Sequence, residues 1–194
     1  MLAMTVLSTD HPLTPQHARL LLAGLPTEIA PGLDEAELAG VERRWGFRFA
    51  PEHRTLLSAG LPLGDGWPDW RSGDPDRLAA RLAWPVEGVL SEVGPTSFWV
   101  PAWGPRPGDD AEAEAAIRLL LAGAPAMVPV FGHRYLPADP EVTGYPVLSM
   151  YGVDVIHYGL DLLDYLYREF GVGEPAEDRL PLRVPFWSDV IDAA

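Results

Sequence analysis

The stretch PVLSMYGVDVIHYGLDLLDYLYREFG, residues 146–171, decides the fold class. Two β-rich runs, 147–151 and 153–158, flank Gly152, a pattern that predicts a β-hairpin. A helix is predicted directly after it over 160–170, because leucines recur there at helical spacing. The hairpin follows a largely helical first half. A run of helices, then strands, then a helix indicates the α+β class rather than alternating α/β.

The first half of the chain carries clear helix starts. Asp34 with Glu37 has the spacing of a capping box, which predicts a helix over 35–45. Pro51 suits the first turn of a second helix over 51–59. Two more helices are expected at 75–83 and 110–121, and a short one could form at 15–23.

The predicted fold is α+β, with a single mixed or antiparallel sheet and helices packed around it. Its strands are expected near 98–100, 126–131, 147–151 and 153–158. Residues 1–30 are expected to form a lead-in, and 31–194 a single domain. The tail is expected to dock on this domain, because Phe186 and Trp187 carry a large apolar area.

Composition excludes several kinds of chemistry. The 194 residues include no cysteine, which removes disulfides, thiol nucleophiles and thiolate metal sites. All 14 basic residues are arginine, so Schiff-base chemistry and the phosphate-loop lysine are also removed. An arginine-only chain rich in alanine and proline is typical of a GC-rich bacterial genome. No cofactor is expected.

Charge and hydropathy restrict the partners. The net charge is −14, from 28 acidic residues against 14 arginines. Such a surface repels phosphate backbones, so we expect no nucleic-acid partner. It attracts a basic protein, although solubility alone would also explain it. No apolar run approaches membrane length, and residues 1–10 lack the basic start of a secretory signal. We therefore expect no membrane partner and a cytoplasmic location.

Standard catalytic motifs are missing. The sequence has no G-x-S-x-G, no HExxH, no Gly-rich phosphate loop and no EF-hand spacing. No two histidines stand at i, i+4, so no helix presents a histidine pair to a metal. His133 and His157 could still meet across the sheet, although a lone strand histidine is more often structural. We expect no catalytic residues, no metal and no enzyme activity.

Two aromatic segments are candidates for binding. The first, 67–71, places two tryptophans in a Gly/Pro loop, and the second, 132–137, follows a predicted strand. We expect 133–135 to lie on a loop near the tryptophans, because binding sites concentrate on loops of a rigid scaffold. For the individual residues, a structural role is the favoured alternative to binding. The two tryptophans would then pack on the domain, and the arginine would pair with an internal carboxylate. The candidate binding residues are Trp67, Asp69, Trp70, His133, Arg134 and Tyr135.

The chain also resembles a known family. The segment GLDEAELAGVERRWGFRF, residues 32–49, followed by APEHRTLLSAGLP, residues 50–62, is similar to the opening of the SUKH superfamily. That superfamily includes the Smi/Knr type of cell-wall-synthesis regulator. The later segments GWPDWR, FWVPAWGPRP, VPVFGHRYLP and VPFWSD, with the hairpin–helix stretch, resemble an actinobacterial branch of it. The resemblance covers roughly residues 30–190.

The resemblance implies a non-catalytic protein-binding module. Many bacterial members are thought to be immunity proteins that neutralise a polymorphic toxin, often a nuclease, and others look like intracellular scaffolds. The family has no catalytic residues to carry over. The expected partner is therefore another protein. If the chain is an immunity protein, this partner is a basic toxin domain. The first alternative function is a general scaffold, and the less favoured one is an enzyme that uses carboxylates and histidine. The oligomeric state is not predicted.

Overall fold

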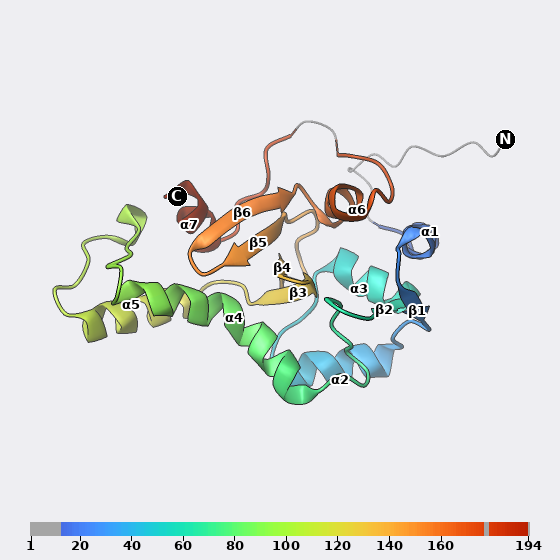
Figure 1. Cartoon of the computed structure of the whole chain (residues 1–194), viewed down its shortest axis with the longest axis horizontal. Helices are drawn as coiled ribbons and strands as arrows, with labels where there is room; N and C mark the ends of the chain where they lie inside the picture. The colour runs from blue at the N-terminus through green and yellow to red at the C-terminus, as the bar shows by residue number, and fades with distance from the viewer. Residues whose placement is uncertain (1–12, 177–178, 194) are drawn as a thin grey trace.

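The computed structural model describes residues 13–176 and 179–193. Within them, seven α-helices surround a four-stranded and a two-stranded sheet, both antiparallel (Figure 1). The helices are α1 (Pro15–Gly24), α2 (Glu35–Trp45), α3 (Pro51–Ala59), α4 (Pro75–Val93), α5 (Asp110–Ala122), α6 (Leu162–Phe170) and α7 (Trp187–Asp192). The strands are β1 (Glu28–Ala30), β2 (Leu61–Leu63), β3 (Met127–Phe131), β4 (Arg134–Pro137), β5 (Val147–Tyr151) and β6 (Asp154–Gly159). The α+β class is confirmed, whereas the second small sheet was not predicted.

The central sheet is a meander in the order β3-β4-β5-β6. The predicted hairpin is confirmed as β5–β6, with Met150 opposite Val155. Consecutive residues of β4 reach opposite faces of this sheet, as the pleat requires. Tyr135 bonds to α4 on one face, and Arg134 pairs with Glu169 of α6 on the other. The sheet is therefore sandwiched, with α4 on one face and α6 on the other.

The N-terminal part of the described chain belongs to the same fold. Helix α1 packs against α3, and its Leu21 and Leu22 are buried in the main core. Strand β1 pairs with β2, so that Ile29 lies opposite Pro62. The short helix expected at 15–23 is confirmed as α1, and residues 13–30 of the expected lead-in pack on the domain, while 1–12 lie outside the described residues.

Helix α2 begins and ends as the sequence predicts. The Glu37 backbone N–H donates to Asp34 Oδ1 at 2.8 Å, and the Asp34 N–H donates to Glu37 Oε2 at 2.9 Å. These two bonds complete the capping box. Gly46 then ends the helix with φ +71°, a left-handed conformation that favours glycine.

Helix α4 is longer than predicted. We expected it to end before Pro85, with a separate short helical turn possible over 86–93, yet one helix continues to Val93 and bends along its length (Figure 1). Proline has no N–H, so the carbonyl of Arg81, four residues earlier, loses its helical partner. The Tyr135 hydroxyl donates to that carbonyl at 2.9 Å. A donor from β4 thus replaces the missing helical bond, which allows the proline to stay inside the helix.

Two other predictions need correction. Residues 98–100 form no strand, and the chain runs instead into a 3-10 turn at Pro101–Trp103. Their aromatic rings pack together, with the Phe98 and Trp103 centroids 5.8 Å apart, and this clustering takes the place of a ladder. Arg134 and Tyr135 lie in strand β4, not in a loop. The turn before them is only Gly132 and His133, which is short enough to return the chain directly to the sheet.

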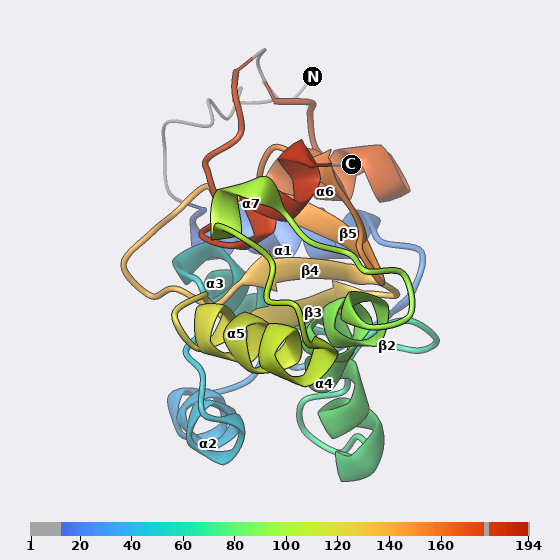
Figure 2. The ribbon, with the colours of Figure 1, turned by 90° about the vertical axis from the view of Figure 1, so that its left-hand side faces the viewer.

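The tail docks as predicted. Trp187 is 1% exposed, and its indole N–H points at the Pro125 carbonyl, 3.5 Å away. The Phe186 ring stacks on Trp103 with centroids 4.8 Å apart. Helix α7 (Figure 2) packs against β6, and both aromatic residues belong to the main core. No helix in the described ranges is both long enough and apolar enough to cross a membrane.

The docked tail predicts a stability difference between two tail positions. Trp187→Ala should lower the free energy of unfolding by about 3–5 kcal/mol, because a large buried side chain is lost. Leu180→Ala is the control, since Leu180 is 89% exposed and should change it by less than about 0.5 kcal/mol. Urea unfolding measures both. Equal effects would show that the tail contributes nothing specific.

A buried histidine predicts a pH dependence. Burial of His53 beside the Phe49 ring lowers the pKa of its imidazole from 6.5 to about 3. Between these values the unfolded chain binds a proton that the folded chain does not, so stability falls as pH falls. His53→Leu should flatten this loss in urea titrations between pH 6.5 and 4. His133→Gln should flatten the loss less, because His133 is exposed and its pKa is lowered only by partial burial and by the charge of Arg134. Identical slopes for both variants would contradict the prediction.

Candidate functional site

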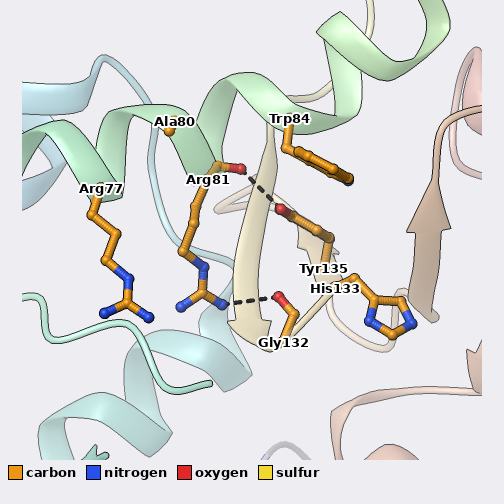
Figure 3. A pocket seen from close by; sticks show the side chains of 7 residues that line it. All are labelled: Arg77, Ala80, Arg81, Trp84, Gly132, His133 and Tyr135. Carbon is orange, nitrogen blue, oxygen red and sulfur yellow. Dashed lines mark hydrogen bonds between the residues drawn. The ribbon is translucent and has the colours of Figure 1, made fainter. Parts of the chain in front are cut away.

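A hollow of about 220 Å³ opens between α4 and the turn that joins β3 to β4. We call it the α4 hollow. Arg77, Arg81 and Trp84 follow one another along one side of α4, and His133 lies across from them (Figure 3). Its lining residues are Arg77, Ala80, Arg81, Trp84, Gly132, His133 and Tyr135.

Arg81 holds this part of the molecule together. Its Nη2 donates to the carbonyls of Gly66 and Gly132, both at 3.0 Å. The Gly132 N–H donates in turn to the Gly66 carbonyl at 2.9 Å. The backbone carbonyl of Arg81 accepts from Tyr135 (Figure 3). One residue therefore joins α4, the loop before it and the β3–β4 turn.

The charge of Arg81 is not balanced by a neighbouring acid. Within the described part of the chain, no carboxylate oxygen lies within 4.0 Å of its guanidinium. Partial burial lowers the pKa of Arg81, and the positive charge of Arg77 lowers it further. Arg77 stands one helical turn earlier on α4 and is exposed. The α4 hollow is thus locally positive in a chain that is strongly negative.

Two exposed aromatic rings border the hollow. Trp84 is 44% exposed and Tyr151 is 68% exposed, with ring centroids 5.9 Å apart. We call this pair the aromatic rim. The Trp84 indole N–H donates to the Met150 carbonyl at 3.4 Å, which ties the helix to the β5–β6 hairpin. The rim exposes apolar area that the fold does not use.

Of the six residues proposed from the sequence, two line the α4 hollow. His133 is exposed, and the pKa of its imidazole is lowered by partial burial and by the charge of Arg134. Tyr135 is buried, and burial raises the pKa of its hydroxyl to about 12. Its hydroxyl serves α4, so Tyr135 shapes the hollow without offering a free donor to it.

Arg134 does not line the hollow, although its Nη1 contacts Nε2 of His133, which does. On the α6 face its Nη1 donates to Ser149 Oγ at 2.9 Å, and its Nε lies 3.4 Å from Glu169 Oε2. The guanidinium also lies over the Tyr158 ring, 3.8 Å from the centroid. The alternative reading, in which Arg134 pairs with an internal carboxylate, is the one that the structure shows.

The tryptophan loop divides between core and surface. Trp67 is buried and stacks on Phe170 with centroids 5.4 Å apart. Trp70 is buried in a separate cluster, 5.6 Å from Phe49. Asp69 accepts backbone N–H bonds within its own turn, from Arg71 and Ser72. Packing rather than exposure therefore explains both tryptophans.

Trp67 and Asp69 nevertheless reach the same region of the surface. Both line a second hollow of about 280 Å³, which shares Arg77 and Arg81 with the α4 hollow. The bond from the Gly132 N–H to the Gly66 carbonyl brings the loop and the β3–β4 turn together. The predicted proximity of the two segments is confirmed at Trp67, whereas Trp70 lies apart.

The two histidines that could meet across the sheet do not, and the described ranges hold no cluster of metal ligands. There, no group of three or more His, Asp or Glu side chains could hold a metal ion. His157 lies on β6, where it stands opposite Leu148 and not His133. Its pKa is lowered by burial, and the nearest charges acting on it are those of Asp192 and Arg183.

The sequence reasoning missed the residues on α4. Arg77 and Arg81 are spaced i, i+4, which places them on one helical face. Trp84 directly precedes Pro85, where a helix was expected to stop. Once Pro85 was taken as the end of the helix, neither the continuous Arg77–Arg81–Trp84 face nor its contact with the hairpin could be inferred.

Comparisons with known proteins add no assignment. No family model matches the chain, and searches of curated proteins and of solved structures give no significant match.

The bond that accommodates Pro85 predicts a contrast between two tyrosines. Tyr135→Phe should lower the free energy of unfolding by about 1–3 kcal/mol, because the Arg81 carbonyl then lacks a donor. Tyr165→Phe is the matched control, since the Tyr165 hydroxyl is buried without a protein partner. That change should be neutral or stabilising. Chemical unfolding of both variants measures the difference, and equal costs would refute the role of Tyr135.

Proposed function

We propose that this protein is a non-catalytic binding module whose α4 hollow and aromatic rim form the contact surface for another protein. The observation that carries the proposal is the aromatic rim, two large rings exposed beside a formed hollow. Trp, Tyr and Arg are the residues that most often dominate binding energy at protein interfaces. Here all three types meet on one face, at Arg77, Trp84 and Tyr151.

The surface is rigid enough to act as a preformed docking site. The Trp84 indole is held by the Met150 carbonyl at 3.4 Å. A Cβ placed on Gly88 would lie 3.0 Å from Gly152 Cα, so the helix and the hairpin tip are in close contact there. A surface that is already ordered loses less conformational freedom on binding, which favours affinity.

Charge supports a basic partner. The net charge of −14 attracts a positively charged protein and speeds its encounter. The resemblance to the SUKH superfamily supports the same class of function. In its specific form, the proposal is an immunity protein that covers the basic active site of a toxin domain, and it has no hydrolase, transferase or nuclease activity of its own. A general scaffold with a different protein partner is the second candidate.

The test uses the product of a neighbouring toxin-like gene. Co-expression with the intact chain should rescue growth, and the purified proteins should form a complex. Tyr151→Ala should weaken that complex by tenfold or more, because hot-spot truncations cost about 2 kcal/mol or more. Tyr151 is largely exposed, so its loss should not unfold the protein. Calorimetry or surface binding gives the affinities.

Leu119→Ala is the control, because Leu119 is 77% exposed on α5 and belongs neither to the lining of the hollow nor to the rim. Its affinity should equal that of the unchanged chain. Association should also slow as salt rises, since steering by charge is screened. A complex that is indifferent to Tyr151→Ala would place the interface elsewhere. Failure to rescue or bind any neighbour would favour the scaffold.

A further inference from the structure

The α4 hollow has a chemical preference that the overall charge does not suggest. Acids outnumber arginines two to one, 28 against 14, so most half-buried guanidiniums find a carboxylate. Arg54, for example, lies 2.7 Å from Glu35, and Arg179 lies 2.8 Å from Asp161. In the described ranges, Arg81 is half-buried and has no such partner. Among the described residues its guanidinium bonds only to backbone carbonyls, so its charge can still pair with an anion from outside the chain.

We infer that the α4 hollow is a subsite for one carboxylate group of the partner protein, an Asp or Glu side chain held between Arg77 and Arg81. The inference rests on the proposed function, because it requires the partner to dock on this face. It adds the chemistry of one contact, an acidic side chain at the centre of an interface with an otherwise basic protein.

The geometry of the two arginines supports an anion between them. They stand at i, i+4 on α4, where like charges repel each other and destabilise a helix. Nη2 of Arg81 is occupied by the Gly66 and Gly132 carbonyls. Its Nε and Nη1 make no bond to any described residue and can donate to a ligand. An oxyanion bound there would relieve the repulsion and accept charge-assisted hydrogen bonds.

The surroundings favour a single negative charge. Partial burial and the charge of Arg134 lower the pKa of His133, which favours its neutral form beside the arginines. The neighbouring hollow beyond the arginines is lined by Asp65, Asp69 and Asp74. These acids and the net charge of −14 would repel a phosphate more strongly than a carboxylate. A monoanion therefore fits best.

The apolar part of the hollow accounts for the rest of the ligand. Ala80 and Trp84 line it next to the arginines (Figure 3). They offer apolar contact to the methylene groups that carry a side-chain carboxylate. A volume of about 220 Å³ is large enough for one such side chain.

The test titrates the full-length chain with sodium acetate at constant ionic strength, using sodium chloride as balance, and follows side-chain N–H signals by NMR. The Nε–H signals of Arg77 and Arg81 and the indole N–H of Trp84 should shift together and saturate. Arg77→Gln should weaken the apparent affinity at least fivefold, because it removes the exposed half of the pair. Arg43→Gln, an equal charge change on α2, should leave it unchanged.

Three results would overturn the inference: shifts that follow chloride as well as acetate, shifts indifferent to Arg77→Gln, or inorganic phosphate binding more tightly than acetate. The last would make the subsite a phosphate site. The same variants in the partner-binding assay separate the two proposals. A complex weakened by Tyr151→Ala but not by Arg77→Gln refutes only the carboxylate subsite. A complex indifferent to both refutes the proposed docking face itself.

Discussion

The hydrogen bond from Tyr135 to the Arg81 carbonyl is the interaction on which this face of the molecule depends. Proline at position 85 removes the helical donor for that carbonyl, and a buried carbonyl without a partner is costly. A hydroxyl on the central sheet supplies the donor at 2.9 Å. Because of this bond, α4 continues to Val93 and reaches the hairpin tip. The same bond holds the Arg81 backbone, and with it the start of the Arg81 side chain, against β4.

Strand β4 distributes its side chains between two different tasks. Tyr135 bonds to α4 and lines the hollow. The adjacent Arg134 pairs with Glu169 of α6 and donates to Ser149. Arg134 and Arg81 have the same side chain but different surroundings. Arg134 is neutralised inside the fold, and Arg81 keeps its charge at the surface. Burial and neighbouring acids, rather than residue type, decide which of them can meet a partner.

The sequence predicted the elements whose signals are local. The capping box at Asp34 and the hairpin around Gly152 depend on residues close in the chain, and both were found. The length of α4 was missed because the donor that rescues Pro85 comes from a strand fifty residues later. The strand expected at 98–100 failed because Phe98 and Trp99 pack on Trp103, and that ring in turn stacks on Phe186 of the tail. The same reason applies to the hollow: of the six residues chosen from loop composition, two line it, and only tertiary contact reveals that Arg81 and Trp84 line it as well.

The close approach of Gly88 and Gly152 has an evolutionary consequence. A side chain at Gly88 would push the hairpin tip away from α4, and Gly152 adopts φ +61°, which also favours glycine. These two glycines set the distance between α4 and the hairpin tip, and they offer no side chain to a partner. Tyr151 and Arg77 face outward without setting the spacing, whereas Trp84 also ties α4 to the hairpin through the Met150 carbonyl. A lineage could therefore exchange the outward residues and adopt new partners while the frame stays intact, so that recognition can diverge without loss of the fold.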